Sequence, residues 1–141
     1  MSGPPFLDTN VILRHVLGDN ADHSPRATAL FRRIERGELA VRLADTVVFE
    51  TVFTLEKVYR IPRNAIRDAV QLILDLPGVI LPGKTAYDPV FDLYVSRGAL
   101  SFADCFHVVL AQRLQLSGII SFDREIGRVL VSSSTLSVVV L

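Results

Sequence analysis

The sequence Phe-Leu-Asp-Thr-Asn at residues 6–10 indicates the fold more directly than any other stretch of the chain. Its two apolar residues predict a short buried strand, and Asp8 follows that strand directly. The apolar stretch from Asn10 to Leu17 then has helical periodicity and stops at Gly18. A strand followed at once by a helix is the repeating unit of an α/β domain, and ligands of such sheets bind at the carboxyl ends of the strands. Asp8 is therefore the first candidate site residue.

The same alternation continues through the rest of the chain. Short apolar runs predict strands at residues 6–7, 39–43, 79–81, 119–120 and 137–141. Helices are predicted at residues 10–17, 24–37, 45–59, 63–76, 84–96 and 101–118, the second of them opened by Ser24 as a capping residue with Pro25 behind it. This pattern is typical of an α/β domain with a mainly parallel sheet. Because neither a linker nor a repeat is present, we expect a single domain over residues 1–141.

Composition excludes several classes of protein. Half of the 141 residues are apolar, 21% are charged, and the mean hydropathy is +0.39, which suits a compact domain rather than a disordered chain. Every apolar run is shorter than the roughly 18 residues of a membrane-spanning helix. The single cysteine and the absence of a secretory signal favour the cytoplasm. Fifteen basic residues balance fifteen acidic ones, so overall charge alone does not hold the chain on nucleic acid.

Two further aspartates occupy comparable positions. Asp123 comes directly after the apolar run at residues 119–122, and Asp104 falls in the first turn of the predicted sixth helix. Each also has a purely structural interpretation. Asp8 and Asp123 can cap the helices that follow them, and Ser101 with Asp104 matches a capping box. Helical periodicity places Asp104 on the same side as buried positions, which predicts a carboxylate that points inward.

The predicted third helix is apolar around more than one side. Its apolar residues cover far more than the usual stripe of about 100°. Either the helix is buried between the sheet and its neighbours, or its second side forms a homodimer interface, and the sequence leaves both open. Glu50 lies on the remaining polar arc with Thr54 and Lys57, so periodicity alone predicts a solvated side chain.

The carboxylates become informative when they are taken together. Two carboxylates 4 Å apart repel each other by about 4 kcal/mol at an effective dielectric constant near 20, so a cluster of ionised acids needs a counter-charge. With three histidines and one cysteine in the chain, a four-ligand zinc site is nearly excluded. Oxygen ligands alone select hard divalent cations. The residue types therefore favour Mg²⁺ or Mn²⁺.

Four motifs in this chain resemble those of the PIN-domain ribonucleases, and among them the VapC-type toxins of toxin–antitoxin pairs. The motifs are Phe-Leu-Asp-Thr-Asn at residues 6–10, Val-Phe-Glu at 48–50, Phe-Ala-Asp at 102–104 and Ser-Phe-Asp-Arg at 121–124. They follow the family's order and spacing over most of the chain. One departure is the stretch from Gly127 to Ser134, which makes a longer connection to the last strand than is usual in the family.

The resemblance implies a PIN-like three-layer α/β/α sandwich with a mainly parallel central sheet. It further implies that Asp8, Glu50, Asp104 and Asp123 converge to bind Mg²⁺ or Mn²⁺ and form the catalytic site of an endoribonuclease. Thr9, Asn10 and Ser121 match positions that hydrogen-bond around such a centre. The implied partners are an RNA substrate, a cognate antitoxin protein and a second copy of the chain in a homodimer, with no membrane.

Two groups of arginines are candidates for contact with the RNA backbone. Arg32, Arg33 and Arg36 share one side of the second helix, and Arg60, Arg63 and Arg67 cluster further on. A solvated helix face explains each group equally well. A different class of function also stays open, namely a PIN-like RNA- or protein-binding scaffold module whose acids are no longer catalytic. A phosphate-accepting signalling domain is disfavoured, because neither lysine of the chain is placed as such a domain requires.

Overall fold

The computed structural model describes residues 2–131 and 137–140. Contacts divide the chain into two compact units, the N-terminal unit (Met1–Lys84) and the C-terminal unit (Thr85–Leu141), and each is described by itself. The N-terminal unit contains α1 (Thr9–Leu17), α2 (His23–Glu35), β1 (Val41–Arg42), α3 (Asp45–Phe53), a π-helix (Thr54–Val58), α4 (Arg63–Leu74) and β2 (Val79–Ile80). After a 3₁₀ turn (Lys84–Ala86), the C-terminal unit contains α5 (Tyr87–Ser96), α6 (Phe102–Arg113), β3 (Gly118–Ser121), α7 (Arg124–Val131) and β4 (Ser137–Val140).

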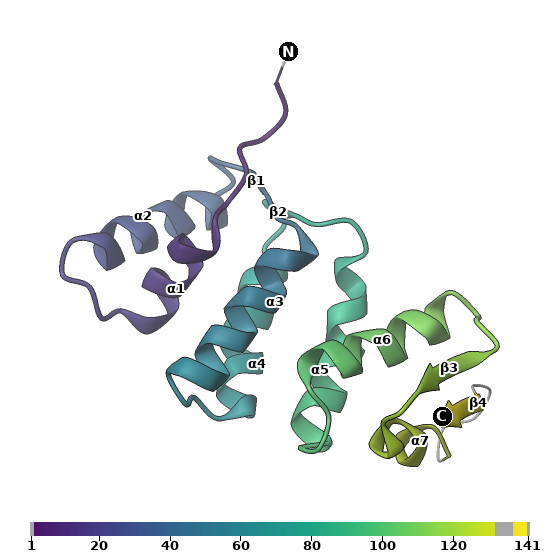
Figure 1. Cartoon of the computed structure of the whole chain (residues 1–141). Helices are drawn as coiled ribbons and strands as arrows, with labels where there is room; N and C mark the ends of the chain where they lie inside the picture. Colours follow the sequence, from purple (N-terminus) through teal and green to yellow (C-terminus); the bar gives the residue numbers. More distant parts are fainter. Residues whose placement is uncertain (1, 132–136, 141) are drawn as a thin grey trace. The chain divides into compact units, whose positions relative to one another are not determined.

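The strands of both units pair in parallel. In the N-terminal unit β1 pairs with β2, and Phe6 forms a parallel bridge to Arg42 on the other side of β1 (Figure 1). In the C-terminal unit β3 pairs with β4 over four residues, from Gly118 opposite Ser137 to Ser121 opposite Val140. The predicted α/β class with parallel strands is therefore confirmed, although β1 and β2 are shorter than the apolar runs that indicated them.

The start of the second helix differs from the prediction. Ser24 does not cap α2, since its hydroxyl accepts a hydrogen bond from the backbone of Asn20 at 3.2 Å. The N-cap residue is Asp22, which makes no side-chain capping bond. Instead, Oδ1 of Asn20 accepts from the backbone N–H groups of Asp22 and His23 at 3.0 and 2.7 Å. The turn before the helix thus supplies the acceptor that the sequence pattern assigned to Ser24.

Two other helices also differ from the sequence pattern. The predicted helix at residues 45–59 is α-helical only as far as Phe53 and continues as the π-helix. The stretch from Gly127 to Ser134 is predicted as a longer connection, but its first part belongs to the helix α7, which ends at Val131. The rest of that predicted connection, residues 132–134, lies outside the described residues.

A close backbone contact fixes the start of β2 in the N-terminal unit. Gly78 accepts a hydrogen bond from the backbone of Val41 at 2.8 Å. A Cβ atom at Gly78 would lie 2.9 Å from the carbonyl oxygen of Leu39 and from a methyl group of Ile34. Only glycine fits here without a shift of backbone, so this residue permits the approach of α2 to the β1–β2 pair.

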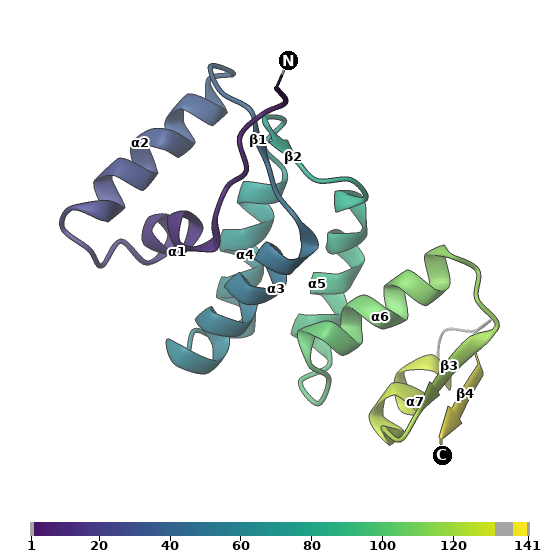
Figure 2. The same cartoon turned by 45° about the horizontal axis from the view of Figure 1, so that its top comes forward.

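Helices α1 and α2 pack side by side around a histidine (Figures 1 and 2). The His15 ring stacks on Phe31 with ring centroids 4.5 Å apart, and its Nδ1 is hydrogen-bonded to the Thr28 hydroxyl at 2.9 Å. Burial lowers the pKa of His15 below its ordinary value of 6.5.

This burial predicts a loss of stability in mild acid. The unfolded chain, with the ordinary pKa, binds a proton more readily than the folded chain, so the free energy of unfolding falls as the pH drops below 6.5 towards the lower pKa of the folded state. Above pH 6.5 both states hold the neutral ring and His15 contributes no pH dependence. Urea unfolding at a series of pH values should show a weaker acid dependence for His15→Gln than for the unsubstituted chain. An equal dependence of the unfolding free energy on pH in the two proteins would contradict the prediction.

The core of the C-terminal unit is an aromatic cluster between α5 and α6. Phe102 lies against Phe91 with ring centroids 5.1 Å apart and against Tyr94 at 5.3 Å, edge to face. Tyr87 stacks on Phe102 at 6.2 Å, and all four rings are buried. Beside them Cys105 is fully buried, as expected for a packing residue.

Within the part of the chain that the structure describes, no helix has the length and apolar character needed to cross a membrane.

Candidate functional site

Asp8 lies between the paired segment at Phe6 and the helix α1. The backbone of Leu7 donates to the carbonyl of Arg42 at 2.9 Å, which holds the segment against β1. Asp8 itself is extended, with φ −81° and ψ 152°, and occupies the N-cap position of α1 without a side-chain capping hydrogen bond. The capping interpretation is therefore wrong for this residue. Its carboxylate is exposed, while the next residue, Thr9, is buried.

Glu50 lies on the exposed side of α3. Val47, Val48 and Thr51 of the same helix are buried, and the Thr51 hydroxyl donates to the Val47 carbonyl at 2.7 Å. The exposure of Glu50 agrees with the polar arc that periodicity predicted. Since α1 packs against α3, Asp8 and Glu50 are carried by two helices in contact within one unit.

Asp104 belongs to a complete capping box at the start of α6. Its backbone N–H donates to the Ser101 hydroxyl at 3.1 Å, and its Oδ2 accepts from the Ser101 backbone at 3.3 Å. The structural interpretation of this pair is confirmed. The side chain is half-buried rather than fully inward, next to the buried positions Val108 and Ala111 of the same helix.

Asp123 lies between β3 and α7, two residues after the end of the strand, and caps α7. Its Oδ1 accepts from the Glu125 backbone at 2.8 Å, which is the bond expected of an aspartate just before a helix. Its own N–H donates to the Ser121 hydroxyl at 2.9 Å, so Ser121 fixes the backbone on which the carboxylate stands. The capping interpretation is confirmed here as well. In both Asp104 and Asp123 the capping bonds use one carboxylate oxygen, Oδ2 and Oδ1 respectively.

The four acids are divided equally between the two units. Asp8 and Glu50 lie in the N-terminal unit, and Asp104 and Asp123 lie in the C-terminal unit. Among the described residues, no three histidine, cysteine, aspartate or glutamate side chains lie close enough to hold a metal ion. Convergence of all four acids stays a prediction. The chemistry of the donor set nevertheless fits a hard divalent cation, because every candidate ligand is a carboxylate and that of Asp8 is not engaged in capping.

Three of the six arginines in the two groups predicted from the sequence form ion pairs with acidic side chains. Arg63 forms an ion pair with Glu56 at 3.4 Å, and Arg67 forms one with Asp68 at 3.0 Å. On α2, Arg33 lies 3.9 Å from Glu38. These contacts agree with the interpretation as solvated helix faces, and they leave contact with RNA a prediction.

A basic pocket between α1 and α2 was missed by the sequence analysis. It is a cavity of about 420 Å³, and its lining contains two arginines and a histidine but no acid: Asn10, Val11, Arg14, His23, Arg26 and Ala27. The sequence gives little sign of this pocket, because its lining residues meet only when one turn of α1 packs against the first turn of α2. Only the spacing of His23 and Arg26, which places them on one side of a helix, could have pointed to it.

Comparison with known proteins identifies the family of the chain. No curated protein matches the chain. The family model described as the PIN domain matches residues 6–130, a range that includes all four candidate acids. The parallel strands and seven α-helices of the described residues are consistent with the α/β/α fold of that family. The chain belongs to the PIN domain family.

Proposed function

We propose that this protein is a Mg²⁺- or Mn²⁺-dependent endoribonuclease that hydrolyses RNA phosphodiester bonds, and that it is the VapC-type toxin of a type II toxin–antitoxin pair. PIN domains are generally nucleases, which supports a hydrolase acting on RNA. The single observation that carries the proposal is the state of Asp8. Its position after a paired segment would suit a helix cap, yet its carboxylate is exposed and forms no capping bond. The fold thus leaves this carboxylate available to a ligand.

In the proposed site Asp8 and Asp104 hold the main cation, and Glu50 and Asp123 complete the acidic ring. When bound, the cation supplies charge neutralisation at the scissile phosphate and lowers the pKa of an attacking water. Ser101 and Ser121 position this ring from outside, because their hydroxyls accept from the backbones of Asp104 and Asp123. Each anchored acid keeps one oxygen in its capping bond, so the other is the natural ligand atom.

We also propose that the chain forms a homodimer through the second side of α3 and the π-helix. Phe53, Val58 and Tyr59 are 63%, 65% and 42% exposed, while Val52 and Leu55 of the same segments are buried. Large exposed apolar side chains of this kind are often covered at protein interfaces. Light scattering at micromolar concentration measures the oligomeric state, and a monomer would remove the proposal.

The proposed cognate antitoxin is a separate chain, and its proposal rests on the family resemblance.

A metal titration followed by thermal unfolding tests the proposed function. Mn²⁺ at about a hundred times its Kd should stabilise the protein by about 2.7 kcal/mol, since the ion binds the folded state alone. The Asp8→Asn and Asp104→Asn variants should lose this stabilisation. Asp68→Asn serves as the matched control, because Asp68 is an exposed aspartate paired with Arg67 and should leave the metal response intact.

The alternative function is a catalytically inactive scaffold that binds RNA or protein. One observation favours it: two of the four acids have complete structural roles as helix caps. A folded protein that binds RNA but shows no stabilisation by Mg²⁺ or Mn²⁺ would establish the scaffold and overturn the enzyme.

A further inference from the structure

The basic pocket between α1 and α2 has no role in the proposed acidic site. Arg14 comes from α1, and His23 and Arg26 come from the first turn of α2, so two helices contribute nitrogen donors to one cavity. A volume of about 420 Å³ falls within the range of small-ligand sites, and it suits a nucleotide better than a bare ion. Val11 and Ala27 add an apolar wall to the polar one.

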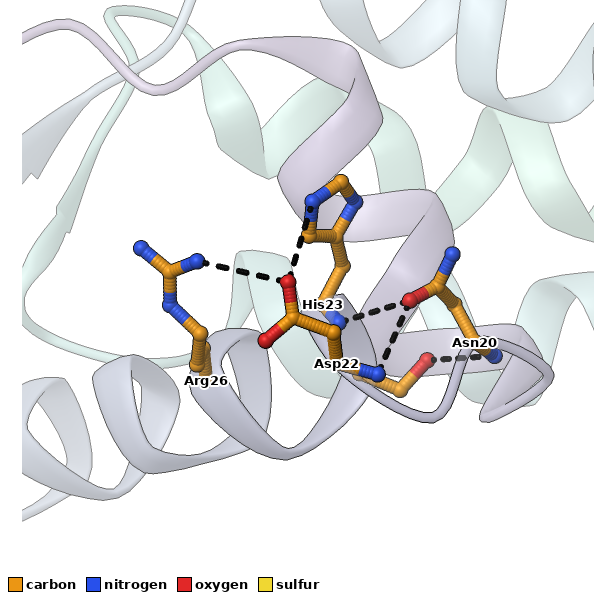
Figure 3. A network of polar contacts seen from close by, with 5 residues as sticks. Asn20, Asp22, His23 and Arg26 are labelled. Carbon is orange, nitrogen blue, oxygen red and sulfur yellow. Dashed lines mark hydrogen bonds and ion pairs between the residues drawn. The ribbon is translucent and has the colours of Figure 1, made fainter.

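Two aspartates lie beside the basic side chains of the pocket without lining it. The carboxylate of Asp22 lies between the two side chains of α2, 3.6 Å from His23 Nε2 and 3.7 Å from a terminal nitrogen of Arg26 (Figure 3). On the other side, Asp19 lies 3.5 Å from a terminal nitrogen of Arg14. Each ion pair engages one nitrogen of a guanidinium group that has five N–H donors. Donors therefore remain on both arginines for a further anion.

Hydrogen bonds also hold the turn that leads into α2. Asn20 accepts from the backbones of Asp22 and His23, and its own N–H donates to Ser24 (Figure 3). These bonds fix the first turn of α2, from which the side chains of His23 and Arg26 project. The pocket is thus built by a hydrogen-bonded turn and two packed helices, so its backbone is ordered before a ligand binds.

We propose that this pocket binds a phosphate of the RNA substrate, with the attached nucleoside against Val11 and Ala27. This inference rests on the proposed ribonuclease function, for which it assigns a substrate-binding subsite. Asp8 is the N-cap residue of α1, and Arg14 lies about 9 Å further along the axis of that helix. In this proposal the scissile phosphate lies at Asp8 and a neighbouring phosphate of the same strand lies at Arg14. Arginine is suited to this contact, because its planar group donates two parallel hydrogen bonds to a phosphate.

The test measures RNA binding in the full chain with Asp8→Asn, so that no cleavage occurs during the measurement. The probe is a short fluorescein-labelled single-stranded RNA, and its Kd is measured at several salt concentrations. Combining Arg14→Gln with Arg26→Gln should weaken binding about tenfold and lower the slope of log K against log salt by about 0.7, the value for one lost phosphate contact. The Asp22→Asn variant should tighten binding about threefold, because it removes a negative charge and keeps the nitrogen donors.

Arg128→Gln is the matched control. Arg128 is 71% exposed and pairs with Glu125, while Arg26 is 74% exposed and pairs with Asp22. This control should change neither Kd nor slope. Thermal unfolding of each variant excludes a folding defect, since replacement of an exposed arginine changes stability by about 0.5 kcal/mol or less.

The outcomes separate this pocket from the nuclease proposal. Unchanged RNA affinity and slope in the arginine variants would overturn the subsite, while metal-dependent cleavage by the unsubstituted chain would leave the ribonuclease intact. Competition by adenosine monophosphate that the arginine variants abolish, with RNA binding unchanged, would assign the pocket to a free nucleotide and overturn the RNA assignment. A loss of RNA binding confined to the arginine variants supports the proposal.

Discussion

Asp8→Asn is expected to lower the rate of metal-dependent RNA cleavage by about a hundredfold to a thousandfold with almost no change in stability. The substitution keeps the size of the side chain and removes the charge that a hard cation requires. Because Asp8 makes no capping hydrogen bond, asparagine removes no contact that α1 needs. The free energy of unfolding should therefore change by about 0.5 kcal/mol or less. The measurement compares initial cleavage rates of a defined RNA at saturating Mn²⁺.

The same exchange at Asp104 should behave differently. It should lower the cleavage rate to a similar extent, but it also weakens the capping box with Ser101, because the charged acceptor at the helix N-terminus becomes neutral. We expect a loss of about 0.5–1 kcal/mol of stability in that variant alone.

The control variant is Asp92→Asn. It replaces an exposed aspartate of α5 and should keep the full cleavage rate and stability. Cleavage by Asp8→Asn at the full rate would show that another group carries the chemistry. Equal stability losses at Asp8 and Asp104 would contradict the different capping roles of the two carboxylates.

The ends of the elements were predictable where the signal was local. The helix ended by Gly18 and the capping box at Ser101 each depend on a few adjacent residues. The strand predicted at residues 6–7 is only a single bridge from Phe6 to Arg42. The start of α2 was not predictable from the sequence, because Asn20 and Ser24 are both good acceptors. Only the folded turn decides which of them faces the free N–H groups. Propensity alone does not separate such neighbours.

The exposed surfaces needed tertiary structure. Periodicity showed that residues 46–59 are apolar on two sides, but it could not tell that the end of the segment becomes a π-helix with Phe53 and Val58 exposed. The basic pocket was harder still, because its residues come from two helices and the turn between them has no fixed period. The four acids could be found as single residues at the ends of elements, whereas their convergence depends on the whole chain.

Phe91→Ala is expected to destabilise the protein by about 3–5 kcal/mol, the usual cost of deleting a buried phenyl ring. Its ring contacts Phe102, Tyr94 and Tyr87 at centroid distances of 5.1, 6.2 and 6.4 Å, so its loss opens a cavity among large rigid groups that cannot collapse. For a domain with a total stability of about 5–15 kcal/mol, this is a large fraction. The melting temperature should fall by about 10 °C or more.

This loss should also reach the candidate site, because Phe102 is the first residue of α6 and the capping box of Asp104 occupies the same turn. A looser cluster allows that turn to fray, so Phe91→Ala should raise the hydrogen-exchange rate of the Asp104 amide, which Ser101 protects. Phe122→Ala is the matched control, since Phe122 is 79% exposed and its removal should change stability by about 0.5 kcal/mol or less. Equal melting temperatures for the two variants would show that the aromatic cluster does not hold α5 and α6 together.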